Sequence, residues 1–279
     1  MTAPPTIRAR VSMFAAIVLA TLALGSGCSA EPAPDATPTT PPARSSEPAT
    51  DAAPAAGGGA YVALGDSYAA GMGGGEYLDS CLTSPNGYAA TLASDAGARE
   101  AELRGCAGAT TDDVIASQLG ALDEGTGTVT LTVGANDLGV RALGEACFSG
   151  TPEVCFATVE TGLERLGELS VDLVTLLDAV RVAAPRATVY VTGYPLLVEE
   201  PRDDAEAAVN EGMALLNDVI EGAVAAAGGD VVFVEVESAF VGHRIGGADP
   251  WLIAPPDGEA FHPNPAGYAA YAEAIRAAG

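Results

Sequence analysis

The sequence Ala-Tyr-Val-Ala-Leu-Gly-Asp-Ser-Tyr-Ala-Ala-Gly, at residues 60–71, contains the clearest structural signal in the chain. Its first five residues are almost wholly apolar, as expected for a strand that is buried on both faces. Gly65, Asp66 and Ser67 follow at once, and these residue types favour a turn. The segment therefore predicts a buried strand that turns directly into the next element, with a serine at the turn.

Alternating strand and helix patterns continue from here to the C-terminus. Further strands are predicted up to Leu103 and at residues 128–133, 187–192 and 231–236. Helices are predicted at residues 86–98, 110–122, 154–183, 204–227 and 264–278, the third of them as one long helix or two shorter ones. Strands that alternate with helices form a parallel sheet with both faces covered. We therefore predict an α/β fold, a three-layer α/β/α sandwich with a mostly parallel central sheet, over residues 60–279.

Residues 1–27 have the pattern of an export signal. Two arginines precede an uncharged run at residues 11–24, which is too short to cross a bilayer as a helix. The run ends in Leu-Gly-Ser-Gly-Cys and resembles a bacterial lipoprotein signal, in which cleavage leaves a lipid-carrying Cys28 at the new N-terminus. Gly25 stands where that signal usually has leucine. We expect an outward-facing membrane lipoprotein, and ordinary cleavage with free secretion is the alternative.

Residues 28–59 are rich in Pro, Ala, Thr, Ser and acidic residues and contain almost no large apolar side chain. Such a segment cannot bury a core, so we predict a disordered tether. The remaining residues, 60–279, then form one folded domain.

The charge balance excludes several kinds of partner. The 279 residues include 12 basic residues against 37 acidic ones, a net charge of −25. Nucleic acids need a basic surface, and so does an anionic membrane held by charge. We therefore expect no nucleic acid, and contact with a membrane only through the lipid on Cys28. The two histidines and five cysteines show no zinc-site spacing, so we expect no metal.

The other four cysteines are Cys81, Cys106, Cys147 and Cys155. An even number in an exported chain indicates two disulfides. Three pairings are possible, and loop-closure entropy favours Cys81–Cys106 with Cys147–Cys155.

Four residues with possible catalytic chemistry follow predicted strands, where ligands lie in sheets of this kind. Ser67 lies at a strand-to-helix turn, so its backbone N–H can face a developing oxyanion. Gly108 precedes a helix and can bring a second N–H close to a ligand, and the Asn136 amide can donate to the same oxyanion. His262 is a base suited to neutral pH, whereas His243 is expected to be a packed loop residue.

Together these segments resemble the SGNH family of GDSL-type lipases and esterases, in both order and identity, over residues 60–279. Residues 105–111 and 261–268 are similar to its secreted actinobacterial branch, which the two disulfides also fit. The resemblance implies a flavodoxin-like sandwich and no cofactor. The segments that carry it are Gly65-Asp66-Ser67, Gly108, Gly134-Ala135-Asn136-Asp137 and His262-Pro263.

The resemblance also implies a role for each residue. Ser67 would be the nucleophile and His262 its general base and acid. The backbone N–H groups of Ser67 and Gly108 and the Asn136 side chain would form the oxyanion hole. The implied protein is a monomeric ester hydrolase that cleaves a small-molecule or lipid ester through an acyl-Ser67 intermediate. The alternatives are a wall-linked acyltransferase or deacetylase of acylated glycans and a non-catalytic lipid- or glycan-binding lipoprotein.

One position departs from the family pattern. The family usually has Asp three residues before the catalytic histidine, and this chain has Glu259 there. We expect the Glu259 carboxylate to orient His262 through Nδ1. A backbone carbonyl, in a Ser–His dyad, and Asp257 are the alternatives.

Overall fold

The computed structural model describes residues 59–95 and 101–279. The predicted export signal, the lipidation site Cys28 and the tether up to residue 58 lie outside the described residues. Within them, five strands form one parallel sheet in the order β2-β1-β3-β4-β5, which is the flavodoxin-like order. The strands are β1 (Ala60–Gly65), β2 (Ala101–Leu103), β3 (Thr126–Thr132), β4 (Thr188–Thr192) and β5 (Val231–Val234).

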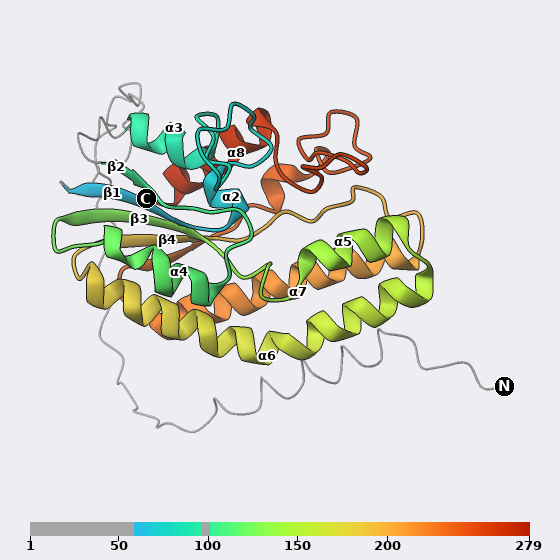
Figure 1. The fold of residues 1–279 in the computed structure, drawn as a ribbon, viewed down its shortest axis with the longest axis horizontal. Helices are drawn as coiled ribbons and strands as arrows, with labels where there is room; N and C mark the ends of the chain where they lie inside the picture. Colours follow the sequence, from blue (N-terminus) through green and yellow to red (C-terminus); the bar gives the residue numbers. More distant parts are fainter. Residues whose placement is uncertain (1–58, 96–100) are drawn as a thin grey trace, which may run out of the picture. The chain divides into compact units, whose positions relative to one another are not determined.

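Helices cover both faces of this sheet. Figure 1 shows α3 and α8 on one face, and α4, α6 and α7 on the other. The predicted three-layer α/β/α sandwich is therefore confirmed. The helices are α2 (Ser67–Ala70), α3 (Tyr88–Asp95), α4 (Thr111–Ser117), α5 (Val140–Ser149), α6 (Pro152–Ala183), α7 (Asp204–Ala227) and α8 (Pro265–Ala278), with short 3-10 helices at Leu119–Ala121 and Ser238–Phe240.

The first strand lies inside the sheet, between β2 and β3. Its central residues Val62, Ala63 and Leu64 are fully buried, as the apolar sequence predicts. Gly65 ends the strand with a φ of +128°, and a Cβ atom there would lie 2.0 Å from the Thr132 carbonyl oxygen. Only glycine fits this close approach, so the chain leaves the sheet at Gly65 and presents the next residues at the sheet edge.

The helix boundaries differ from the prediction mainly around α5. This helix was not predicted, because it is short and contains a glycine at Gly144 that interrupts its apolar pattern. The predicted helix at residues 154–183 is one continuous helix, α6, which begins at Pro152. Proline suits the first turn of a helix because its missing N–H has no helical partner there.

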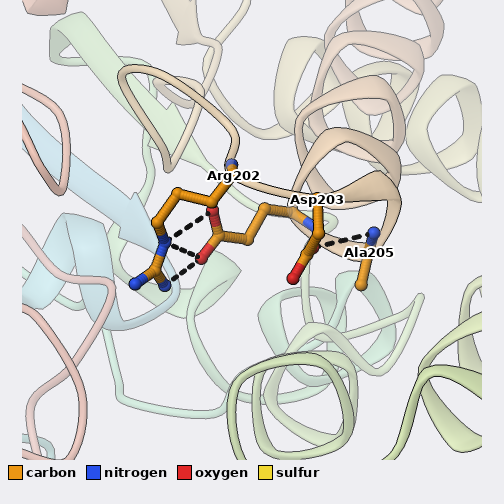
Figure 2. A network of polar contacts seen from close by, with 4 residues as sticks. Arg202, Asp203 and Ala205 are labelled. Carbon is orange, nitrogen blue, oxygen red and sulfur yellow. Dashed lines mark hydrogen bonds and ion pairs between the residues drawn. The ribbon is translucent and has the colours of Figure 1, made fainter.

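The start of α7 is fixed by side chains, as Figure 2 shows. The Asp203 carboxylate accepts hydrogen bonds from the backbone N–H groups of Ala205 and Glu206, at 3.0 and 2.9 Å. Arg202 forms an ion pair with the Glu206 carboxylate, and this hydrogen bond lowers the pKa of Glu206. These contacts explain why α7 begins at the predicted residue.

Both favoured disulfides are present. Cys81–Cys106 joins the loop after α2 to the loop before α4, and Cys147–Cys155 joins α5 to α6. In the described part of the chain, every helix is too short or too polar to cross a membrane.

Candidate active site

Ser67 is the first residue of α2, directly beyond the end of β1. The Asp66 side chain caps this helix by accepting a 2.9 Å hydrogen bond from the Tyr68 N–H. Gly71 ends it in the left-handed region, at a φ of +93°. At the first turn of a helix the backbone N–H has no helical partner, and no acceptor among the described residues contacts the Ser67 N–H. This N–H is therefore free to bind an oxyanion.

His262 approaches Ser67 from the loop that follows β5. The distance from its Nε2 atom to the Ser67 Oγ is 2.8 Å. Its Nδ1 atom lies 3.1 Å from the carbonyl oxygens of both Glu259 and Ala260. Because a carbonyl only accepts hydrogen bonds, Nδ1 carries the proton and the Nε2 lone pair faces the Ser67 hydroxyl. Burial lowers the pKa of His262, so the ring is neutral and able to act as a base near pH 7.

The predicted contact between the Glu259 carboxylate and His262 is wrong. Glu259 presents its backbone carbonyl to the ring, and the same carbonyl accepts the His262 N–H at 3.2 Å. This tight turn places the carbonyl beside Nδ1, and the carboxylate instead accepts a 2.5 Å hydrogen bond from the Tyr77 hydroxyl. Asp257 does not orient the ring either, because its carboxylate accepts the Glu259 N–H. The geometry is that of a Ser–His dyad oriented by backbone carbonyls.

The other predicted oxyanion donors follow the two strands beside β1. Gly108 lies in the loop after β2 with a φ of +87°, and its N–H has no acceptor within the described residues. Asn136 follows β3, and its Nδ2 atom donates one hydrogen bond to the Ala109 carbonyl at 2.9 Å. An amide nitrogen has two protons, so one remains for a ligand. Because the carboxyl ends of parallel neighbours meet at one edge of the sheet, Ser67, Gly108 and Asn136 share that edge.

A second contact joins the loop that follows β2 to the loop that follows β3. The Asp137 carboxylate accepts a 2.6 Å hydrogen bond from the Thr111 hydroxyl and a 3.1 Å bond from the Thr111 N–H. Burial raises the pKa of Asp137, and these hydrogen bonds oppose the shift. Asp137 therefore supports the loops that present Gly108 and Asn136.

Asp66 is buried beneath the nucleophile and is only 1% exposed. The Tyr194 hydroxyl donates a 2.6 Å hydrogen bond to its carboxylate. Burial raises the pKa of Asp66 to about 7 in spite of this bond. Asp66 acts on Ser67 through the helix cap and not by direct contact.

Sequence reasoning did not identify two tyrosines that hold the His262 loop. The Tyr68 hydroxyl donates a 2.5 Å hydrogen bond to the carbonyl of Phe261, whose φ is +73°. Tyr77 contacts Glu259, as described above. No motif or spacing marks these residues, because their partners lie more than 180 positions away in the sequence.

His243 is not part of the site. Its ring stacks on Trp251 at 3.5 Å between ring centroids, and its Nδ1 lies 2.7 Å from the Asp249 carbonyl oxygen. The described residues contain no group of three or more His, Cys, Asp or Glu residues placed to hold a metal ion.

Comparison with known proteins identifies the family of this chain. Residues 63–270 match the GDSL-like Lipase/Acylhydrolase family. Lipase 1 of Streptomyces coelicolor is 33% identical over 220 residues, which cover 74% of this chain and 81% of the relative.

Solved structures of similar fold include a lipase and a phospholipase A1. The structure of a phospholipase A1 from Streptomyces albidoflavus superposes with a TM-score of 0.75 at 31% identity, covering 79% of this chain and 99% of that one. The structure of an extracellular lipase from Streptomyces rimosus gives a TM-score of 0.74 at 31% identity, with coverage of 79% and 100%.

Proposed function

Because the chain belongs to the GDSL-like lipase/acylhydrolase family and is a carboxylic ester hydrolase, we propose that it works through an acyl-Ser67 intermediate. The observation that carries this proposal is the 2.8 Å contact between His262 Nε2 and Ser67 Oγ. Carbonyl oxygens on Nδ1 hold the ring in the tautomer that can accept the serine proton.

In the acylation half, the Ser67 Oγ attacks the ester carbonyl carbon and its proton moves to His262 Nε2. The carbonyl π electrons move to oxygen, and the resulting oxyanion accepts hydrogen bonds from the N–H groups of Ser67 and Gly108 and from Asn136 Nδ2. When the intermediate collapses, the bond to the alcohol oxygen breaks. The leaving oxygen takes the proton from Nε2, and the acyl group stays on Ser67.

In the deacylation half, water takes the place of the alcohol. His262 accepts one water proton while the water oxygen attacks the acyl carbon, and the same three donors bind the second oxyanion. Collapse breaks the bond to Ser67 Oγ, which recovers its proton from Nε2. The carboxylic acid leaves and the enzyme returns to its starting state.

The proposed substrate is the acyl ester of a lipid. Relatives of similar sequence and structure bear the names lipase and phospholipase A1, and one is called extracellular. The export signal and Cys28 fit an enzyme held at the outer face of the membrane, close to such esters. We propose a lipid-anchored form, in agreement with the sequence pattern of residues 1–27, and we propose that the enzyme is a monomer.

Hydrolysis of p-nitrophenyl esters from acetate to palmitate tests this function. The purified enzyme is compared with its Ser67→Ala and His262→Ala variants. We expect both variants to lose at least about 10³-fold in kcat, because serine and base act as one unit, and we expect the intact enzyme to prefer the longer chains. A folded enzyme that cleaves none of these esters, or a Ser67→Ala variant that cleaves them at the intact rate, would contradict the proposal.

A further inference from the structure

Tyr77 and Glu259 form a direct contact between two loops of the site. The Tyr77 hydroxyl donates to Glu259 Oε1 at 2.5 Å, although the residues are 182 positions apart in the sequence. Both side chains are partly buried. The tyrosine is also fixed from its own loop, because its oxygen accepts the Gly73 N–H at 2.9 Å. The hydroxyl is thus both a donor and an acceptor, which fixes its direction.

The loop that holds Tyr77 packs directly against His262. Gly73 has a φ of +96°, and a Cβ atom there would lie 2.4 Å from the Pro263 carbonyl oxygen and 3.1 Å from His262 Cβ. The Met72 carbonyl accepts a 2.5 Å hydrogen bond from the Tyr268 hydroxyl of α8, which anchors this loop. A shift at Tyr77 is therefore transmitted to the histidine loop.

Glu259 controls the orientation of His262 through its main chain. Its carbonyl oxygen accepts the His262 backbone N–H at 3.2 Å and lies 3.1 Å from Nδ1. One carbonyl thus orients both the backbone and the ring of the histidine. A contact that holds Glu259 in place therefore also holds the His262 ring in place beside Ser67.

We propose that the Tyr77–Glu259 pair is a positioning device for His262. The Glu259 carboxylate acts by binding the Tyr77 hydroxyl, and its negative charge raises the pKa of His262 less than the two backbone carbonyls do. The proposal rests on the proposed Ser67–His262 function and assigns a role to a carboxylate that the dyad itself leaves unused.

Three variants separate positioning from charge. Glu259→Gln keeps an acceptor oxygen for Tyr77 and removes the charge, Glu259→Leu removes both, and Tyr77→Phe removes the donor. We expect Glu259→Leu and Tyr77→Phe each to lower kcat about tenfold with KM unchanged, since small misplacements of a catalytic base cost rates of this order. Glu259→Gln is expected to stay within about twofold of the intact enzyme. The acid limb of the Glu259→Gln pH–rate profile should move only slightly, toward lower pH, because the Glu259 charge is the smallest influence that raises the pKa of His262.

The double variant Tyr77→Phe/Glu259→Leu shows whether the two residues act together. A shared contact predicts a loss of about tenfold, no worse than either single variant, whereas independent effects would multiply to about 100-fold. Tyr190→Phe and Glu221→Leu are matched controls. The Tyr190 hydroxyl makes no hydrogen bond to a described residue, and Glu221 is exposed on α7. Both controls should keep the intact kcat.

A Glu259→Gln variant as impaired as Glu259→Leu, with its acid limb moved strongly to lower pH, would overturn the proposal in favour of a charge effect. Full kcat in Tyr77→Phe, or multiplying losses in the double variant, would also overturn it. Circular-dichroism melting of each variant confirms that the fold is retained. Ser67→Ala, assayed in parallel, distinguishes these outcomes from failure of the proposed function, which would show as activity independent of Ser67.

Discussion

His262 is oriented by neutral carbonyl groups, and this affects both directions of its proton transfer. A carboxylate beside Nδ1 favours the imidazolium strongly, and carbonyl dipoles do so less. The ring is also buried, which lowers the pKa of His262. Such an imidazole remains an acceptor at mildly acidic pH. Once protonated by Ser67, it passes the proton readily to the leaving oxygen.

The lowered pKa of His262 predicts the acid limb of the pH–rate profile. Protonated His262 cannot accept the Ser67 proton, so activity is present above its pKa and is lost as the pH falls through it. Because burial places this pKa below 6.5, we expect the midpoint of kcat/KM below pH 6.5. The measurement is ester hydrolysis from pH 4 to 9 with stability checked at each pH. A midpoint above 6.5 in the folded enzyme would show that the ring is stabilised as a cation.

The oxyanion-donor role that we propose for Asn136 can be separated from its structural role. We expect Asn136→Ala to lower kcat about 10²- to 10³-fold with little change in KM, because oxyanion donors act in the transition state. Thr111→Val is the matched control, since it breaks a hydrogen bond between the same two loops and keeps the amide. Steady-state kinetics should show a much smaller loss for Thr111→Val. Equal losses would mean that Asn136 only holds the loops together.

The disulfides act on different elements of the site. Cys81–Cys106 ends two residues before Gly108, and the Ala107 N–H also donates to the Cys81 carbonyl at 3.0 Å. Cys147–Cys155 braces α5, whose Phe148 ring packs on Phe261 at 4.9 Å between centroids. The first disulfide therefore supports the loop that carries Gly108, and the second supports the loop that carries Phe261 and His262.

Removal of each disulfide should give a distinct result. The sequence separations are 25 and 8 residues, so chain entropy gives losses in unfolding free energy of about 3.5 kcal/mol for Cys81→Ser/Cys106→Ser and about 2.5 kcal/mol for Cys147→Ser/Cys155→Ser. We expect only the first pair to lower kcat markedly. Urea unfolding and ester hydrolysis measure the two effects. A larger kcat loss from Cys147→Ser/Cys155→Ser than from Cys81→Ser/Cys106→Ser would show that α5 matters more to the site than the loop that carries Gly108.

At the level of elements, the sequence predicted what local patterns determine. The buried strands and the α7 and α8 helices are encoded in apolar runs and capping residues. The sequence does not predict α5 because this helix is short and contains Gly144, so that its stability depends on packing and on the Cys147–Cys155 disulfide. The Glu259 carboxylate was misassigned because the spacing between Glu259 and His262 in the sequence does not determine which group the Glu259 side chain binds. The competing donor, the Tyr77 hydroxyl, is visible only in three dimensions.

The folded domain buries a titratable carboxyl group beneath Ser67. Asp66 is surrounded by the buried rings of Tyr68 and Tyr194 and is nearly inaccessible. Burial raises its pKa to about 7, whereas an unfolded aspartate has a pKa of about 3.9. The folded state therefore binds a proton that the unfolded state releases between these pH values. This contribution to stability is complete below about pH 4 and is lost as the pH rises toward 7.

Asp66→Asn should remove this contribution. We expect the unfolding free energy of the intact protein to fall by about 3 kcal/mol more than that of Asp66→Asn between pH 4 and 7, because the folded and unfolded pKa values lie close to the two ends of this range. Asparagine also caps helices, so the variant keeps the start of α2. Urea unfolding at each pH, read as the difference between the two proteins, isolates Asp66 from the general repulsion among acidic residues. Parallel curves would show that Asp66 stays ionised in the folded protein.

The proposed reaction depends most on the acyl-Ser67 intermediate, which the Ser67–His262 dyad forms. The most direct test is to mix the enzyme with a p-nitrophenyl ester, quench in acid within the first turnover, and analyse the intact protein and its peptides by mass spectrometry. We expect the added mass of one acyl group on the peptide that contains Ser67. We also expect the same adduct in Glu259→Gln and none in Ser67→Ala or His262→Ala. An acyl group on another residue, or ester cleavage at the full rate with Ser67 replaced, would contradict the proposed reaction.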